Sequence, residues 1–259
     1  MASANGRLNG FDPTQIRAVA FDCYGTLIDF DERAFAPAID TFLRDRGVNH
    51  VPGRDVWAAW MESAREHASR HGRDPEQPLD GPEPPFYSFA EVWPRHFRRA
   101  FAATGIEGID PRAALDYVFA LMSRAPVYDE VPQVVAAVRR AGFSIAVASN
   151  ADDVHLFPAL ELGGIKAELV VSSENVRSYK PRRPFFDALC EQLGAQHREI
   201  LYVGDSPYAD VRGACNVGMP VYWVRRYRDP EREKLLQGEP TWIFSDLRGL
   251  PPLLQGARQ

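Results

Sequence analysis

The sequence predicts an α/β fold in which a parallel sheet forms the core and a helical module follows the first strand. Short apolar runs rich in β-branched residues recur along the chain, and each has the length of a buried strand. Helical patterns lie between these runs, which is typical of a parallel sheet with right-handed crossovers. One long stretch, residues 32–128, breaks the alternation and has no strand pattern.

The predicted core comprises residues 15–31 and 129–259, preceded by a polar flexible tail over residues 1–14. Its expected strands are Ala18–Phe21, Ile145–Ala148, Leu169–Val171, Ile200–Val203, Val221–Val224 and the short Trp242–Phe244. Apolar residues at helical spacing predict helices over Val131–Gly142 and Pro184–Gly194, each of which ends at a glycine.

Residues 32–128 are predicted to form a separate helical domain. The expected helices are Val56–His71, Phe89–Thr104 and Pro111–Ser123. The segment Gly72–Phe86 holds five prolines and therefore is predicted to be a loop, either ordinary or acting as a lid. We interpret the stripe of Trp57, Trp60, Met61 and Ala64 on the first helix as core packing.

Composition indicates a soluble globular protein. The chain has 259 residues, of which 45% are hydrophobic, and a formal net charge of -5, which argues against binding to nucleic acid or to an anionic membrane. Three cysteines are too few and too scattered for a disulfide framework or a zinc site. Neither a signal peptide nor a membrane span is predicted, so a cytoplasmic location is expected.

The predicted chemistry lies where the strands end, because ligands of an open parallel sheet bind beyond the carboxyl ends of its strands. Each of these polar residues, taken alone, is more typical of a turn or a solvated surface, and their alignment at four strand ends favours a site. The residues that follow the strands are Asp22, Ser149, Asn150, Lys180, Asp205 and Asp210.

The residue types suggest covalent catalysis by a carboxylate. Lys180 can keep Asp22 ionised, while Ser149 and Asn150 can donate hydrogen bonds to charge that develops on a substrate. Asp205 together with Asp22 can supply the hard oxygen ligands that Mg²⁺ prefers.

These residues occur in four motifs that resemble those of the haloacid dehalogenase superfamily, over roughly residues 17–225. The resemblance implies a Rossmann-like core with a helical cap domain inserted between the first two motifs. It also implies that Asp22 is the nucleophile, that Thr26 and Ser149 are the motif hydroxyls, and that Lys180 balances charge. Asp205 and Asp210 correspond to the acidic fourth motif, which with Asp22 and the Tyr24 carbonyl would hold Mg²⁺.

The first and fourth motifs point to different reactions within the superfamily. Its phosphatases usually carry an aspartate two residues after the nucleophile as general acid and base, whereas this chain has Tyr24, which resembles the 2-haloacid dehalogenases. The dehalogenases, however, replace the acidic fourth motif that this chain keeps at Asp205 and Asp210. Their cap arginine also corresponds to Met61 here, and Arg65 could substitute only with a shifted helix.

We therefore expect Mg²⁺-dependent hydrolysis of a small-molecule phosphate ester. The alternatives are a 2-haloacid dehalogenase, which would form an ester on Asp22 without needing Mg²⁺, and a catalytically retired protein that binds a small anion. A phosphonoacetaldehyde hydrolase is disfavoured because the cap contains no lysine. The expected partner is a small anionic substrate contacted by Arg65, Tyr24 and Asn150, and the protein is expected to be a monomer or homodimer.

Overall fold

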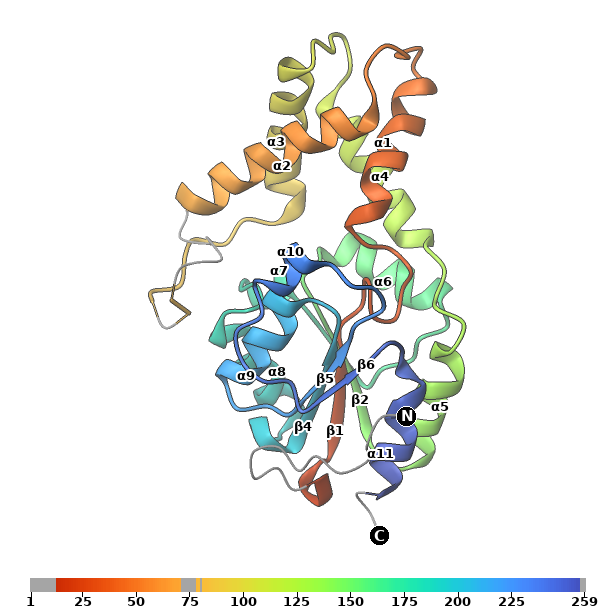
Figure 1. Cartoon of the computed structure of the whole chain (residues 1–259), viewed down its shortest axis with the longest axis vertical. Coiled ribbons are helices and arrows are strands. Elements are labelled where there is room, and N and C mark those ends of the chain that lie inside the picture. The colour runs from red at the N-terminus through yellow and green to blue at the C-terminus, as the bar shows by residue number, and fades with distance from the viewer. Residues whose placement is uncertain (1–12, 71–77, 80, 257–259) are drawn as a thin grey trace.

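The computed structural model describes residues 13–70, 78, 79 and 81–256, which form an α/β core and a helical cap (Figure 1). The core sheet has six parallel strands in the order β3-β2-β1-β4-β5-β6. These strands are β1 (Ala18–Phe21), β2 (Ser144–Ser149), β3 (Leu169–Ser172), β4 (Ile200–Gly204), β5 (Val221–Val224) and β6 (Trp242–Phe244).

All six predicted strands are confirmed, and three of them are longer than expected. β2, β3 and β4 each extend by one residue at the carboxyl end, to Ser149, Ser172 and Gly204, because these small or polar residues still pair in the sheet. The apolar pattern alone does not include them.

Helices cover both faces of the sheet (Figure 1). Alternate residues of the central strand β1 point to opposite faces of the sheet. Val19 and Phe21 pack in the hydrophobic cluster that includes α5 and α11, while Ala18 and Ala20 pack in the cluster that includes α8. The core helices are α5 (Val131–Arg140), α6 (Asp153–Leu162), α7 (Ser173–Val176), α8 (Arg183–Leu193), α9 (Gly213–Asn216), α10 (Pro230–Glu233) and α11 (Leu250–Gly256).

The cap comprises α1 (Phe35–Arg44), α2 (Gly53–Arg70), α3 (Phe89–Ala103) and α4 (Pro111–Arg124). It contains no strand in its described residues, as the sequence predicts. Within the predicted Gly72–Phe86 loop, residues 71–77 and 80 lie outside the described part, as do residues 1–12 of the predicted tail. The remainder of that loop contains no helix or strand.

Helix α1 and helix α6 were not predicted from the sequence. Both contain a proline, Pro37 in α1 and Pro158 in α6, as does the predicted helix α3 at Pro94. Along the described residues, no helix has the length and apolar character needed to cross a membrane.

The sheet brings the polar strand ends together. β1 pairs with β2 on one side and with β4 on the other, and Phe21 aligns with both Val147 and Val203. Asp22 therefore leaves the sheet between the ends of its two neighbours, at the point where strand order reverses.

Candidate active site

Lys180 lies at the centre of a buried polar cluster at the carboxyl edge of the sheet. Its Nζ donates to Asp22 Oδ1 at 2.6 Å and to Asp210 Oδ1 at 2.7 Å, and it lies 2.9 Å from the Tyr202 hydroxyl. Ser149 Oγ also donates to Asp22 Oδ1, at 3.3 Å. The structure thus brings together four predicted residues from four separate segments, and adds Tyr202.

The charges of this cluster compensate one another. Burial alone would lower the pKa of Lys180, but the Asp210 and Asp22 carboxylates outweigh it and hold that pKa well above its usual value. Lys180 is therefore a cation throughout the neutral range. Burial raises the pKa of Asp22 to about 6, and Lys180 opposes this shift by favouring the ionised carboxylate. Both side chains that contact Asp22 bind Oδ1, which leaves Oδ2 as the oxygen that neither engages.

Asp205 completes the acidic side of the site. Thr26 Oγ1 and the Arg232 guanidinium are its side-chain partners, and each lies as far as 3.5 Å from the carboxylate. Burial, together with the carboxylates of Asp210 and Asp22, raises the pKa of Asp205 to about 8. The negative charge of Asp205 is thus poorly compensated by nearby positive charge.

The loop after β1 packs closely against Asp205. Gly25 has a φ of +86°, and a Cβ at this position would lie 2.8 Å from the Asp205 carboxylate. Only glycine combines this left-handed backbone with so close an approach. The indole Nε1 of Trp223, in β5, donates to the backbone oxygen of Asp205 at 2.9 Å. This bond fixes the loop that follows β4 and carries Asp205.

The donor set fits a hard divalent cation. Asp22, Asp205 and Asp210 each offer a carboxylate oxygen, and the three oxygens lie within 4.8 Å of one another. Asp210, however, already accepts from Lys180 and Tyr202 through Oδ1 and from the Ser206 backbone N–H through Oδ2. Asp22 and Asp205 therefore remain as the carboxylates best placed to bind a metal, with Asp210 holding Lys180.

Asn150 lies beside the site but its side chain points to the Lys180 backbone. Its Nδ2 donates to the Lys180 carbonyl at 3.0 Å, and its Oδ1 accepts from the Lys180 N–H at 2.8 Å. The amide thus positions the Lys180 backbone, and its Nδ2 keeps a second N–H, so the predicted donation to a substrate stays a prediction.

The hydroxyl of Tyr24 is paired with His155. The Asp152 N–H donates to His155 Nε2 at 3.1 Å, which places the proton of the neutral imidazole on Nδ1. That Nδ1 lies 2.9 Å from the Tyr24 hydroxyl, which in turn donates to the His155 carbonyl at 3.2 Å. Burial lowers the pKa of His155 to about 3 and raises that of Tyr24 above its usual value. The phenol is therefore an engaged and weak acid, which makes it poorly suited to donate a proton to a leaving group.

The structure does not bring Arg65 to the site. It lies exposed on α2, whereas the neighbouring Ala64 and Trp60 line the cavity between cap and core. The cations that do line the cavity are Lys180 and Arg182, both buried residues of the core.

Sequence reasoning missed three residues that surround the site. Tyr202 lies inside β4, where an apolar run conceals a hydroxyl that contacts Lys180. Arg226 is the second residue after the end of β5, so the same strand-end rule applied to that strand could have found it. Arg232 comes from the short helix α10, which carries no sequence signal for its proximity to Asp205.

Comparison with known proteins places this site in a family. A family model described as haloacid dehalogenase-like hydrolase matches residues 16–218. The chain is 24% identical over 247 residues to an (S)-2-haloacid dehalogenase of Pseudomonas sp. (strain YL), covering 93% of this chain and 96% of that protein. It is also 25% identical over 246 residues to a phosphoglycolate phosphatase of Haemophilus influenzae, covering 93% and 99%.

Solved structures show the same fold. An L-2-haloacid dehalogenase from Xanthobacter autotrophicus matches with a TM-score of 0.70 and 24% identity, over 93% of this chain and 99% of the other. A hydrolase of the superfamily from Bacillus subtilis, solved with magnesium, matches with a TM-score of 0.71 and 18% identity, over 92% and 98%. The resemblance found in the sequence is confirmed: the chain is an enzyme that belongs to the haloacid dehalogenase-like hydrolases.

Proposed function

We propose that this hydrolase cleaves a small-molecule phosphate monoester with the help of Mg²⁺, using Asp22 as a covalent nucleophile. The observation that carries the proposal is Asp205. Its carboxylate, 13% exposed, adjoins Asp22 and has only distant partners, and its removal from solvent and the charges of Asp210 and Asp22 raise its pKa to about 8. A divalent cation would supply that charge.

Asp22 and Asp205 would hold the metal, together with the backbone carbonyl of Tyr24 assigned from the motif. When bound, Mg²⁺ supplies positive charge that neutralises phosphate oxygens and favours binding of the phosphate dianion. The Lys180 ammonium keeps Asp22 ionised and adds further positive charge beside the phosphate. Asn150 and Asp210 fix the backbone and the ammonium of this lysine respectively.

The reaction proceeds in two steps. An Asp22 oxygen attacks phosphorus while the bond to the ester oxygen breaks, which leaves an aspartyl-phosphate and releases the alcohol after the leaving oxygen takes a proton from water. A second water then attacks phosphorus, which releases phosphate and restores the carboxylate. Because Tyr24 is paired with His155, no phenolic acid assists the leaving group, and esters with good leaving groups should react faster.

The second candidate is a 2-haloacid dehalogenase, which Tyr24 and the similarity to such enzymes favour. Asp22 would then attack the halogen-bearing carbon, halide would leave without needing a proton, and water would hydrolyse the resulting ester. Asp205 would have no direct task in that reaction.

Two substrates and two variants separate these reactions. We expect Mg²⁺-dependent phosphate release from an aryl phosphate, which chelation abolishes and Asp22→Asn reduces by at least ~10³-fold. Asp205→Asn should lose ~10²-fold or more, because it weakens the metal site. Metal-independent chloride release from 2-chloropropionate, retained in Asp205→Asn, would instead establish the dehalogenase. Silence with both substrates, with anion binding retained, would indicate a retired enzyme.

A further inference from the structure

A cavity of about 230 Å³ lies between the cap and the core and adjoins the site. Helices α2 and α3 line it from the cap, and Asn150, Lys180 and Arg182 line it from the core. Lys180 belongs to both the cavity and the nucleophile cluster, since its Nζ lies 2.6 Å from Asp22. A substrate whose phosphate lies at Asp22 would therefore extend its organic part into this cavity.

The walls of the cavity are aromatic. Six aromatic side chains line it, namely Trp60, Phe86, Phe89, Trp93, Tyr179 and Tyr208. Four of them form a continuous stack that joins cap to core. Tyr179 packs on Phe86 and Phe89 with centroids 5.0 and 5.6 Å apart, and Phe89 packs on Trp93 at 4.6 Å, each pair with an interplanar angle of 22°.

The polar groups of the cavity are divided between its two ends. Lys180 and Arg182, both buried cations, lie at the core end, where a phosphate dianion would be held. At the cap end, His96 bonds Ser63 through Nδ1 at 3.0 Å and is neutral, since burial lowers its pKa to about 4. Glu83 also lines the cavity, and its carboxylate accepts from Ser178 Oγ at 2.8 Å. The cavity thus suits a molecule with an anionic head and an uncharged ring.

We propose that the substrate carries an aromatic group, which occupies this cavity against the Phe86, Phe89, Trp93 and Tyr179 rings. The inference rests on the proposed function and specifies the substrate class. An apolar cavity of about 150 Å³ is sufficient to bind benzene, so the space is ample for a ring. An ethyl or carboxymethyl group would leave most of it unfilled. Aromatic walls favour a ring over an aliphatic group of the same size because ring pairs attract beyond the burial of area.

Binding of three phosphonates to the Mg²⁺-loaded enzyme tests the inference directly. Ethylphosphonate, 2-cyclohexylethylphosphonate and 2-phenylethylphosphonate share a headgroup that cannot be hydrolysed, and calorimetry gives their Kd values. We expect the phenylethyl compound to bind at least ~10-fold tighter than the ethyl compound and ~3-fold tighter than the cyclohexylethyl compound. Equal affinities for the phenylethyl and ethyl compounds, or a preference for the cyclohexyl ring, would overturn the inference.

Matched variants locate the selectivity. Phe86→Leu and Phe89→Leu remove a ring while keeping an apolar side chain, and Phe101→Leu does the same at a buried cap position that does not line the cavity. The first two variants should reduce the preference for the phenylethyl over the ethyl compound from at least ~10-fold to less than ~3-fold. Phe101→Leu should keep that preference. An equal loss in all three would show a general effect on the cap and contradict the proposal.

Turnover of the corresponding esters separates this inference from the proposed reaction. Ethyl phosphate and 2-phenylethyl phosphate both release aliphatic alcohols, so leaving-group acidity does not dominate the comparison. Phosphate release from both at equal kcat/KM would sustain the reaction and refute the aromatic preference. No release from either, with the phosphonates binding in the expected order, would refute the reaction and keep the aromatic selectivity.

Discussion

Asp205 and Lys180 show at the residue scale how this site distributes charge. Lys180 has two carboxylates within 2.7 Å, whereas Asp205 has two partners that are each 3.5 Å away. The positive charge of Lys180 is thus compensated by nearby carboxylates, whereas the negative charge of Asp205 has no close cation. This asymmetry is the structural basis for expecting a cation beside Asp205. Asp210 instead accepts a hydrogen bond from Lys180.

Replacing Tyr24 tests whether its phenol takes part in proton transfer. Because the hydroxyl is paired with His155, Tyr24→Phe should change kcat for an aryl phosphate by less than ~3-fold, whereas loss of a general acid typically costs ~10²–10⁴-fold. Steady-state kinetics with purified variant and parent protein provide the measurement. A fall of ~10²-fold would show that the phenol moves into the site during turnover.

His96 predicts a pH dependence of stability. Its pKa is about 4 in the folded protein, mainly because of burial, against an ordinary value of about 6.5. Between these values the unfolded chain binds a proton that the folded protein does not, so stability should decline as the pH falls from about 6.5 to 4. The loss attributable to this residue is on the order of 2 kcal/mol.

Thermal unfolding of His96→Gln across this range checks the assignment. The variant should lose part of the slope of Tm against pH, while the contribution of the other buried imidazole, His155, remains. An unchanged slope would show that His96 is not the titrating group.

At the scale of elements, Arg226 connects the loop of the nucleophile to two other segments. It follows β5 and donates to the backbone oxygens of Gly25 at 3.1 Å and Thr26 at 2.7 Å. It also pairs with the buried Glu130 at 2.8 Å, just before α5. The Glu130 carboxylate in turn accepts from the Leu247 N–H at 3.5 Å. The Arg226 guanidinium thus connects the loop that follows Asp22 to Glu130, in the segment between the cap and α5.

Paired variants can separate positioning from stability. Arg226→Met leaves Glu130 buried without its partner, and should cost about 3–5 kcal/mol of unfolding free energy. Adding Glu130→Gln should restore part of this stability, but kcat should stay ~10-fold or more below the parent value because the Asp22 loop is no longer fixed. Denaturant unfolding and kcat on the same preparations provide both values. Recovery of kcat together with stability would show that Arg226 is merely structural.

The prediction of elements from sequence succeeded where one physical signal dominated. Strands buried on both faces read as apolar runs, and the cap helices α2, α3 and α4 were found within a few residues of their observed bounds. The strand-end rule brought Asp22, Ser149 and Lys180 into one cluster because parallel strands share their carboxyl edge. The side-chain partners of Asn150 and Tyr24 could not be predicted, since they depend on segments that meet only in the folded chain.

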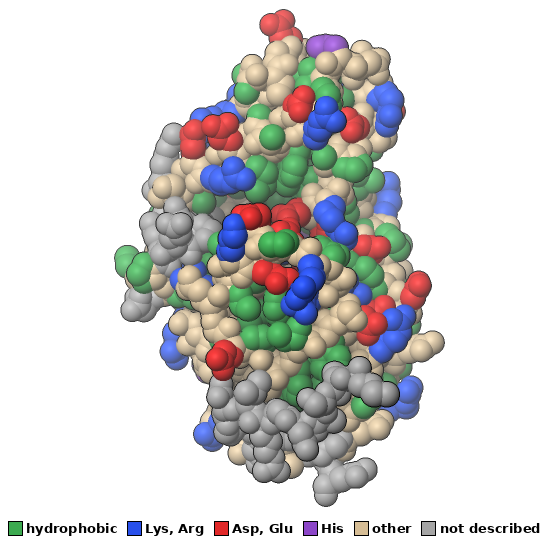
Figure 2. All heavy atoms as spheres, viewed as in Figure 1, with side chains coloured by type: hydrophobic (Ala, Val, Ile, Leu, Met, Phe, Trp, Pro, Cys, Tyr) green, Lys and Arg blue, Asp and Glu red, His purple; other side chains and the backbone are tan. Residues whose placement is uncertain are grey.

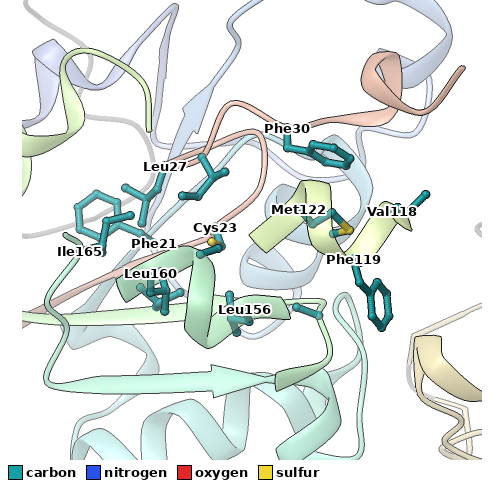
Figure 3. Packing of buried hydrophobic residues seen from close by; sticks show 14 of the residues in the cluster. Phe21, Cys23, Leu27, Phe30, Val118, Phe119, Met122, Leu156, Leu160 and Ile165 are labelled. Carbon is teal, nitrogen blue, oxygen red and sulfur yellow. The ribbon is translucent and has the colours of Figure 1, made fainter. Parts of the chain in front are cut away.

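At the scale of the whole molecule, cap and core share one hydrophobic cluster. Figure 3 shows Met122 of the cap helix α4 facing Cys23 of the core. Val118 and Phe119 of α4 and Leu156 of the core belong to the same buried cluster. Figure 2 shows acidic and basic side chains interspersed on the face of Figure 1, without an extended patch of one sign. The cap is therefore packed on the core through apolar contacts at its base, while the cavity lies elsewhere along the same interface.

This packing predicts cooperative unfolding of cap and core. Met122→Ala removes a buried side chain at the junction and should destabilise the protein by about 2–5 kcal/mol. Calorimetry should show a single transition at lower Tm in the variant, because neither part buries this surface alone. Two transitions, with that of the core unchanged, would show that the cap folds independently.

The central claim is that Asp22 forms a covalent bond with the substrate. Mass spectrometry of enzyme that is rapidly quenched in acid during turnover of an aryl phosphate tests it most directly. The account predicts one added phosphoryl group on the peptide that contains Asp22, and no adduct in Asp22→Asn. Steady phosphate release by an enzyme that never carries the adduct, or an adduct on another residue, would contradict it.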